Sequence, residues 1–198
     1  MVDTLKNLES YHIVLCSQSP RRLELLSRLG LVFEVRNIPD IDESYSPELD
    51  IEEVPLFLSK KKAEAYRRTM NENDLLITAD TIVCLDNQIF GKPKDTDDAR
   101  VTLKRLSGKT HSVITGITIT SKEKQKQKSF IVKSRVSFAN LSNQEIDYYI
   151  REYNPMDKAG AYGIQDWIGM IGIKSIEGSF YNVMGLPVQR LYSELKNF

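Results

Sequence analysis

Apolar runs of strand length alternate with amphipathic stretches along the first part of the chain, and this alternation predicts strands and helices in turn. Strands are expected at residues 11–16, 31–35, 75–85, 112–120 and 130–138. Helices are expected at residues 20–29, 55–70, 96–106, 142–152 and 187–196. Because strands and helices alternate early and a hairpin-like pair of strands follows, the pattern indicates an α/β protein with a mixed sheet.

Polar and glycine-rich stretches interrupt this pattern. The run SKEKQKQK at residues 121–128 lies between two expected strands, which is typical of a solvated hairpin tip. Ser142 and Glu145 form a capping-box pattern at the start of a helix. Glycines recur from residue 160 to residue 185, and so many turn signals favour short strands and loops near a site over regular helices.

The first expected helix begins with an unusual pair of charges. Ser19 suits the N-cap, Pro20 the first helical position and Gly30 the residue beyond the end. Arg21 and Arg22 nevertheless stand in the first turn, where the helix dipole is positive and cations typically cost about 0.3–1 kcal/mol. We therefore expect an anion to bind there. Replacing either arginine by alanine is expected to weaken function while leaving stability intact or slightly improved.

Length and charge exclude several classes of protein. With 198 residues, the chain is expected to form a single domain, 1–198, with room for two lobes. The 27 Lys and Arg residues balance the 27 Asp and Glu residues, which argues against a nucleic-acid partner. No apolar run has the length of a membrane span and the N-terminus is polar, unlike a signal peptide. We therefore expect a cytoplasmic protein with no membrane partner.

Cysteines and histidines offer no metal-binding pattern. Cys16 and Cys84 lie in apolar, strand-like runs and are expected to be buried free thiols. His12 and His111 are too few and too far apart in sequence for a histidine-based zinc site.

Charged residues point to phosphate chemistry, although the phosphate-binding motifs are incomplete. Residues 107–110 read SGKT, but a P-loop needs a glycine where Leu103 stands, and no GxGxxG fingerprint is present. Asp80 interrupts an apolar run, so its carboxylate is either tied to backbone amides at a strand end or used in catalysis. With the two arginines, the acidic stretch 40–44 and isolated lysines, it suggests polyphosphate chemistry.

Beyond these patterns, the sequence resembles the Maf family, the septum-formation-inhibitor-like nucleoside triphosphate pyrophosphatases. The resemblance runs in order along nearly the whole chain. Its segments are SQSPRRLELL (17–26), DIDES (40–44), KKAEAY (61–66), TADTIV (78–83), GKPKDTDDAR (91–100), LSGKTHSVITG (106–116), DKAGAYGIQ (157–165) and IEGSFYNVMGLP (176–187).

The resemblance implies an enzyme that hydrolyses a nucleoside triphosphate to the monophosphate and pyrophosphate. The implied fold is α/β and similar to that of inosine triphosphate pyrophosphatases, with a long mixed sheet, flanking helices and an active-site cleft between two lobes. Thr81 after the acidic residue and Gln165 in YGIQ resemble the branch that acts on dTTP and UTP, with modified pyrimidine nucleotides as further substrates. A glutamine amide offers both a donor and an acceptor, which suits the edge of uracil or thymine.

The resemblance also implies roles for individual residues. Asp80 matches the acidic residue proposed as the general base for water. The family's phosphate-binding start matches Ser17, Arg21 and Arg22, and its further charged residues match Glu43, Lys62 and Lys92. A divalent cation, Mg²⁺ or Mn²⁺, is implied, with Glu43 and Asp80 as the carboxylates near it. Arg21, Thr81 and Gln165 match positions that select the base.

Some features depart from the family pattern or leave alternatives open. The segment before Asp40 is one residue longer than usual, and Asp166 and Trp167 follow YGIQ where a glycine is common. A pyrophosphatase for 7-methyl-GTP and a nucleotide-binding regulator of cell division that acts through a partner remain alternatives. The family often forms dimers, so a homodimer is an open expectation.

Overall fold

The computed structural model describes residues 3–37 and 41–198, and its elements follow the predicted alternation closely. The strands are β1 (His12–Cys16), β2 (Glu34–Val35), β3 (Asp74–Leu85), β4 (Gln88–Phe90), β5 (Thr110–Ser121), β6 (Lys126–Phe138) and β7 (Ile173–Glu177). The α-helices are α1 (Pro20–Arg28), α2 (Val54–Arg67), α3 (Thr96–Leu106), α4 (Asn143–Tyr153), α5 (Trp167–Gly172), α6 (Phe180–Met184) and α7 (Val188–Lys196). Short 3₁₀ helices are η1 (Asp3–Leu8), η2 (Ile51–Glu53), η3 (Pro155–Asp157) and η4 (Ala159–Ala161).

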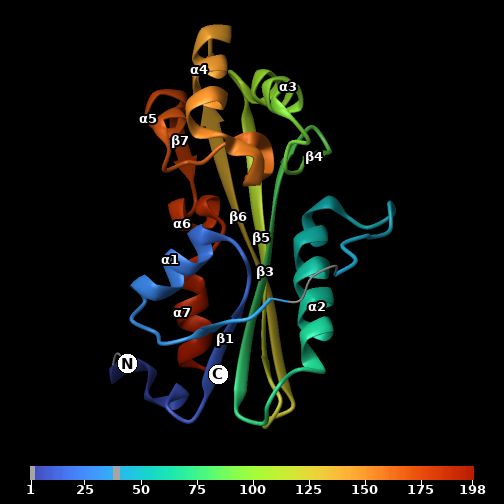
Figure 1. The fold of residues 1–198 in the computed structure, drawn as a ribbon, viewed down its shortest axis with the longest axis vertical. Helices are drawn as coiled ribbons and strands as arrows, with labels where there is room; N and C mark the ends of the chain where they lie inside the picture. The colour runs from blue at the N-terminus through green and yellow to red at the C-terminus, as the bar shows by residue number, and fades with distance from the viewer. Residues whose placement is uncertain (1–2, 38–40) are drawn as a thin grey trace. The chain divides into compact units, whose positions relative to one another are not determined.

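All strands described belong to one mixed sheet (Figure 1). The order is β2-β1-β3-β5-β6-β7, with β4 paired to β3. β1 runs parallel to β2 and β3, whereas β4 is antiparallel to β3 and β7 is antiparallel to β6. The predicted α/β class and mixed sheet are therefore confirmed.

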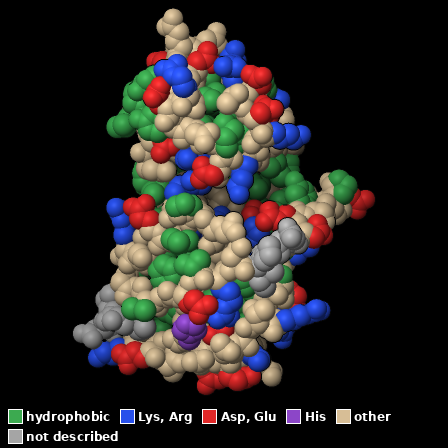
Figure 2. All heavy atoms as spheres, in the orientation of Figure 1, with side chains coloured by type: hydrophobic (Ala, Val, Ile, Leu, Met, Phe, Trp, Pro, Cys, Tyr) green, Lys and Arg blue, Asp and Glu red, His purple; other side chains and the backbone are tan. Residues whose placement is uncertain are grey.

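The chain divides into two compact units. The first contains Met1–Asp80, Thr115–Val132 and Gly185–Phe198, and the second contains Thr81–Ile114 and Lys133–Met184. The predicted single domain and the predicted cleft stay predictions. On the face drawn in Figure 2, basic and acidic side chains are interspersed, in keeping with the balanced charge. Among the helices of the described residues, none has the length and apolar character needed to cross a membrane.

In the first unit, α2 covers one face of the sheet while α1 and α7 cover the other (Figure 1). α2 lies directly against β5 because Gly116 has no side chain: a Cβ there would lie 2.4 Å from the backbone nitrogen of Leu56. Buried hydroxyls add to this contact. Ser59 Oγ lies 2.9 Å from Thr118 Oγ1, and Thr78 Oγ1 donates to the Ser59 carbonyl at 2.8 Å. Backbone contact and hydroxyl bonds therefore fix the position of α2 on the sheet.

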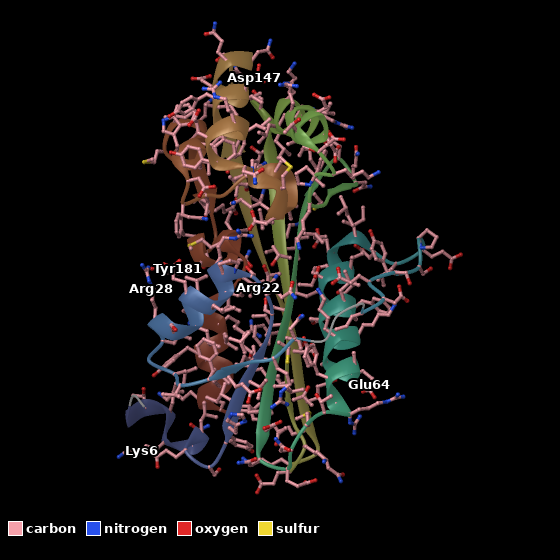
Figure 3. The ribbon with its side chains drawn as sticks, viewed as in Figure 1. Lys6, Arg22, Arg28, Glu64, Asp147 and Tyr181 are labelled. Carbon is pink, nitrogen blue, oxygen red and sulfur yellow. The ribbon has the colours of Figure 1, made fainter. Side chains whose placement is uncertain are left out.

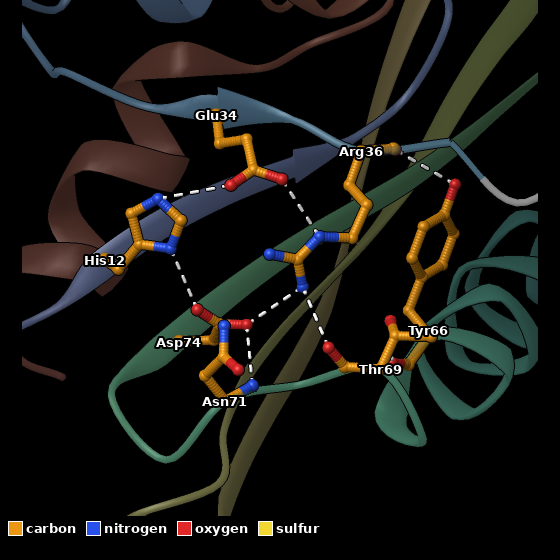
Figure 4. A network of polar contacts seen from close by, with 7 residues as sticks. All are labelled: His12, Glu34, Arg36, Tyr66, Thr69, Asn71 and Asp74. Carbon is orange, nitrogen blue, oxygen red and sulfur yellow. Dashed lines mark hydrogen bonds and ion pairs between the residues drawn. The ribbon is translucent and has the colours of Figure 1, made fainter.

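A second polar network ties the first residues of β1 and β3 to the segment after β2 (Figure 4). Its centre is the fully buried side chain of Asp74. This carboxylate lies 2.9 Å from His12 Nδ1 and from Arg36 Nη1, and it accepts from the Asn71 backbone amide at 2.9 Å. Tyr66 of α2 donates its hydroxyl to the Arg36 carbonyl at 3.0 Å, which links the network to α2.

The second unit contains an aromatic cluster around a buried histidine. The ring of His111, 2% exposed, packs edge-on against Phe138 and Tyr162, and its Nε2 lies 2.8 Å from the Tyr162 hydroxyl. Burial lowers the pKa of His111 to about 4, so the ring is neutral at pH 7.

Three local predictions need correction. The glycine-rich segment was expected to form short strands and loops, but it forms two short helices, α5 and α6, as well as β7. Glycines in this segment allow close packing in addition to turns. At Gly169 inside α5, for example, a Cβ would overlap the Ile164 carbonyl. The strand predicted at 31–35 is only Glu34–Val35. The hairpin turn is confirmed, but β6 already begins at Lys126 inside the polar run.

Candidate active site

The first unit brings together Asp80, Lys62 and Glu43, as the family resemblance predicts. Lys62 Nζ lies 2.6 Å from Asp80 Oδ1 and 2.9 Å from Glu43 Oε1. The side chains of Lys62 and Asp80 are each 14% exposed, whereas Glu43 is 56% exposed. One half-buried ammonium therefore bridges two carboxylates that come from a strand and from the loop after β2.

The position of Lys62 follows from the spacing of residues on α2. Ser59 and Lys62 are three residues apart, so they lie on the same face of the helix. Thr78 and Asp80 are two residues apart on β3, so they share a face of the sheet. Thr78 bonds to the Ser59 carbonyl, and Lys62 bonds to the Asp80 carboxylate. These two contacts fix how α2 lies along β3. Glu64, by contrast, is 69% exposed and points away from the sheet (Figure 3).

This geometry bears on the two interpretations of Asp80 left open by the sequence pattern. Asp80 lies within β3, five residues before the last residue of the strand, Leu85. Its carboxylate accepts a hydrogen bond from the ammonium group of Lys62. Asp80 is therefore not a strand-end residue, and its oxygens face a charged environment.

The part of the loop that carries Glu43 is anchored to α2 by ion pairs and hydrogen bonds. Lys61 Nζ lies 2.8 Å from Asp42 Oδ2 and 2.9 Å from the Ser44 carbonyl oxygen. The Lys61 hydrogen bond lowers the pKa of Asp42. Neighbouring lysines on α2 thus hold neighbouring acidic residues of the loop. Asp40, the first residue of the predicted acidic stretch, lies outside the described residues.

The arginines of the first helix join the same cluster. Arg22 is labelled beside α1 in Figure 3. It donates from Nε to the Gly185 carbonyl at 2.8 Å and from Nη1 to the Ala79 carbonyl at 3.0 Å. Its Nη1 also lies 3.5 Å from Ser17 Oγ. Burial lowers the pKa of Arg22, and the nearby charge of Asp80 opposes this effect. Arg21 and Glu43 also act electrostatically on Arg22, so these charged groups lie close together.

The structure supports Ser19 at the N-cap and Pro20 in the first turn, but the Ser19 side chain makes no capping hydrogen bond. Gly30 has the positive φ of 72° expected just beyond a helix. Just before the helix, the Ser17 hydroxyl accepts from the Ser19 amide at 3.2 Å.

The structure also contradicts the expectation that Arg22 is dispensable for stability. Arg22→Ala would leave the Gly185 and Ala79 carbonyls without this donor, which costs about 1–3 kcal/mol when such groups are buried. We expect a lower midpoint of urea unfolding for this variant. Arg28→Ala is the matched control on the same helix, because Arg28 is 67% exposed and pairs with Glu24 across the surface. Equal midpoints for the two variants would contradict the structural role of Arg22.

The remaining predicted residues belong to the second unit. Thr81 directly follows Asp80 in β3 and is half-buried. Lys92 is exposed between β4 and α3, and Gln165 is exposed between η4 and α5. That these residues share a site with Asp80 stays a prediction.

Sequence reasoning missed two contributors to the site, the Gly185 and Ala79 carbonyls that hold Arg22. A backbone carbonyl leaves no signal in the residue type, and Gly185 is 163 positions away from Arg22. Lys61 reads as one member of a charge run in the sequence. Its pairing with Asp42, beside that of Lys62 with Glu43, could have been found from the matching order of the two segments.

A divalent cation fits the chemistry of this cluster. Among residues 3–37 and 41–198, no group of three or more His, Cys, Asp and Glu side chains is arranged to hold a metal ion by itself. Mg²⁺, however, is usually bound by one or two carboxylates together with substrate phosphates. Asp80 and Glu43 supply two carboxylates, which Lys62 and the nearby arginines already face, so a cation here would be held by these carboxylates together with substrate phosphates.

Comparison with known proteins places the chain among close relatives. It is 59% identical over 192 residues to the dTTP/UTP pyrophosphatase of Phocaeicola vulgatus, covering 97% of this chain and 98% of that protein. The Bacteroides thetaiotaomicron protein of the same name is 56% identical with the same coverage. The Flavobacterium psychrophilum protein of that name is 45% identical over 97% of both chains.

The fold has a structural relative as well. The Staphylococcus aureus Ham1 protein matches 94% of this chain and 98% of its own with a TM-score of 0.55, at only 15% identity, so this likeness concerns the fold alone. The sequence model of the Maf-like protein family matches residues 12–198. The chain therefore belongs to the Maf-like protein family.

Proposed function

We propose that this protein is a nucleoside triphosphate pyrophosphatase that hydrolyses dTTP and UTP to the nucleoside monophosphate and pyrophosphate. The observation that carries the proposal is the identity of 45–59%, over nearly the full length, with proteins named dTTP/UTP pyrophosphatase. The clustering of Arg21, Arg22, Lys62 and Asp80 in the first unit supports it, because polyphosphate hydrolysis needs cations for the phosphates and a carboxylate for water.

In this proposal, the chain's own residues divide the work. Ser17, Arg21, Arg22, Lys62 and Lys92 bind the triphosphate. Asp80 acts as general base and accepts the proton of the water that is added across the bond between the α- and β-phosphates. The Lys62 contact holds the Asp80 carboxylate in one orientation before substrate arrives. Thr81 and Gln165 contact the pyrimidine base, with Arg21 as a further selecting residue.

Asp80 and Glu43 would hold a divalent cation, Mg²⁺ or Mn²⁺. When bound, the cation neutralises charge on the phosphates and so makes the bond between them easier to break. Its removal should therefore lower the rate far more than it lowers stability. We also propose that the protein is cytoplasmic and forms a homodimer.

The test is a hydrolysis assay on the purified protein with dTTP, UTP, dCTP, GTP and 7-methyl-GTP in the presence of Mg²⁺. We expect pyrophosphate and the monophosphate in equal amounts from dTTP and UTP, and little from the others. Addition of EDTA should lower the rate by about 100-fold or more, because a metal ion contributes several kcal/mol to such reactions, and excess Mg²⁺ should restore it. Absence of pyrophosphate release from both pyrimidine nucleotides would refute the function, and full activity in EDTA would refute the metal.

A further inference from the structure

The loop that carries Gln165 is closed by a single buried hydroxyl. Tyr149 of α4 is fully buried. Its hydroxyl accepts a hydrogen bond from the Gly163 backbone amide at 2.9 Å and donates one to Asp166 Oδ2 at 2.6 Å. Gly163 and Asp166 flank Ile164 and Gln165, so one phenol ties together the residues on both sides of this pair. All these residues belong to the second unit.

Further contacts make this closed loop compact. The Asp166 amide donates to the Gly163 carbonyl at 3.0 Å, and the Gly169 amide donates to the Asp166 carbonyl at 2.9 Å. A Cβ at Gly163 would lie 2.4 Å from Asp166 Oδ2, so only glycine allows the carboxylate to approach. Within the loop, Ile164 is buried and Gln165 is exposed. The backbone at Gln165 is therefore held while its side chain projects outward.

The carboxylate of Asp166 interacts with groups around the loop and not with the helix that it precedes. Asp166 stands at the N-cap of α5, where a carboxylate normally caps the helix, yet its side chain makes no capping bond. Lys158 Nζ, itself bonded to Asp157 at 2.8 Å, lies 3.9 Å from Asp166 Oδ2. Burial and the hydrogen bond to Asp166 raise the pKa of Tyr149, which keeps its hydroxyl protonated as the donor. Tyr149 stacks on Tyr153 at 5.2 Å, which limits movement of its ring.

The residue that precedes the loop is also anchored. Tyr162, next to Gly163, is buried and its hydroxyl lies 2.8 Å from His111 Nε2. The chain thus enters the loop from a fixed residue and leaves it into α5. Held in this way, Gln165 has only its own side-chain torsions left to order when a ligand binds, and preorganisation of this kind improves affinity and selectivity.

We propose that Tyr149 and Asp166 are positioning residues for selection of the pyrimidine base, acting through Gln165. This inference rests on the proposed function, because it takes Gln165 to be the residue that contacts the base. Tyr149 and Asp166 do not act on phosphate, so their loss should affect KM and base selectivity and leave kcat unchanged. A merely structural role would instead alter stability without altering the preference among bases.

The experiment compares Tyr149→Phe, Asp166→Ala, Gln165→Ala and the double variant Tyr149→Phe/Gln165→Ala with the unaltered protein. For Tyr149→Phe and Asp166→Ala we expect the ratio of kcat/KM for dTTP over dCTP to fall about tenfold through KM, with kcat within about twofold. The double variant should be no less selective than Gln165→Ala alone, because two residues that act through one contact are not additive. Asp166→Asn keeps an acceptor for the phenol and should retain most of the selectivity.

Tyr153→Phe is the matched control, since Tyr153 lies one turn further along α4 and is 38% exposed. It should leave KM and selectivity unchanged. Circular dichroism and thermal unfolding show whether each variant folds, and Asp166→Ala serves as the second route if Tyr149→Phe does not. If the unaltered protein hydrolyses no dTTP, the proposed function fails. If it does, and Gln165→Ala loses selectivity while Tyr149→Phe and Asp166→Ala keep it, the positioning role is wrong and the function stands.

Discussion

Asp80→Asn should lower kcat for dTTP by about 10²–10⁴-fold, the usual contribution of a general base. The amide has nearly the shape of the carboxylate and can still accept from Lys62 Nζ, which lies 2.6 Å from Asp80 Oδ1, but it cannot take a proton from water. Pyrophosphate release measures the rate. Titration calorimetry with dTTP should show that the variant still binds the nucleotide, which separates loss of the base from loss of binding.

Asp86→Asn is the control for this substitution, because Asp86 follows the same strand and is 70% exposed. Asp86 has a positive φ of 51°, a conformation that asparagine tolerates well, so the variant should fold and keep full activity. Turnover by Asp80→Asn at the rate of this control would exclude Asp80 as the base.

Asp74→Ala should lower the free energy of unfolding by about 3–5 kcal/mol, the typical cost of breaking a buried ion pair from one side. Asp74 is fully buried, whereas its partners His12 and Arg36 have side chains that are 41% and 18% exposed. The substitution leaves the half-buried guanidinium of Arg36 and the Asn71 amide without their shared acceptor. Urea unfolding at pH 7 measures the loss. Glu34→Ala removes a 45%-exposed partner of the same network and should cost less than about 1 kcal/mol.

The pH dependence of stability provides a second measurement on Asp74. Burial acts to raise the pKa of Asp74, but the hydrogen bonds from His12, the Asn71 amide and Arg36 outweigh it, and the pKa is lowered. The folded protein therefore binds fewer protons at this group than the unfolded chain does. Its contribution is complete above the unfolded pKa of about 3.9 and is lost as pH falls through the lower folded pKa. Asp74→Ala should flatten the stability curve in that acidic range, and an unchanged slope would contradict the prediction.

The pattern of hydrophobic positions predicts most of the fold, because apolar residues in most helices and strands recur with the spacing typical of that element. Both predicted ends of the helix at 96–106 agree with the structure, because acidic residues mark its first turn and basic residues its last turn. The pattern failed between residues 160 and 185, where glycines suggest turns but also allow α5 and Ile164 to pack closely. Close packing of this kind depends on residues that come together only in the folded chain.

The candidate site was less accessible to local reasoning. The pattern around Asp80 leaves two interpretations, and grouping it with the acidic stretch 40–44 and isolated lysines indicates only polyphosphate chemistry; the family resemblance singles out Lys62 and Glu43. The anion expected to bind at Arg21 and Arg22 stays a prediction; the Arg22 guanidinium already lies near the charge of Asp80 and donates to the Gly185 and Ala79 carbonyls. Which carbonyls face a guanidinium is set by the tertiary path of the backbone, and no residue type records it.

Because residue 116 has no side chain, the distance between α2 and β5 depends on an uncharged position. α2 can approach β5 this closely only while that position is glycine, and the same helix carries Lys62, whose ammonium contacts Asp80. A larger residue there would act as a spacer, lifting the helix and loosening the ion pair without altering any group that touches substrate. Searches for altered variants that randomise only charged positions would overlook this spacer, which lies under the N-terminal end of α2 on the side that faces the sheet.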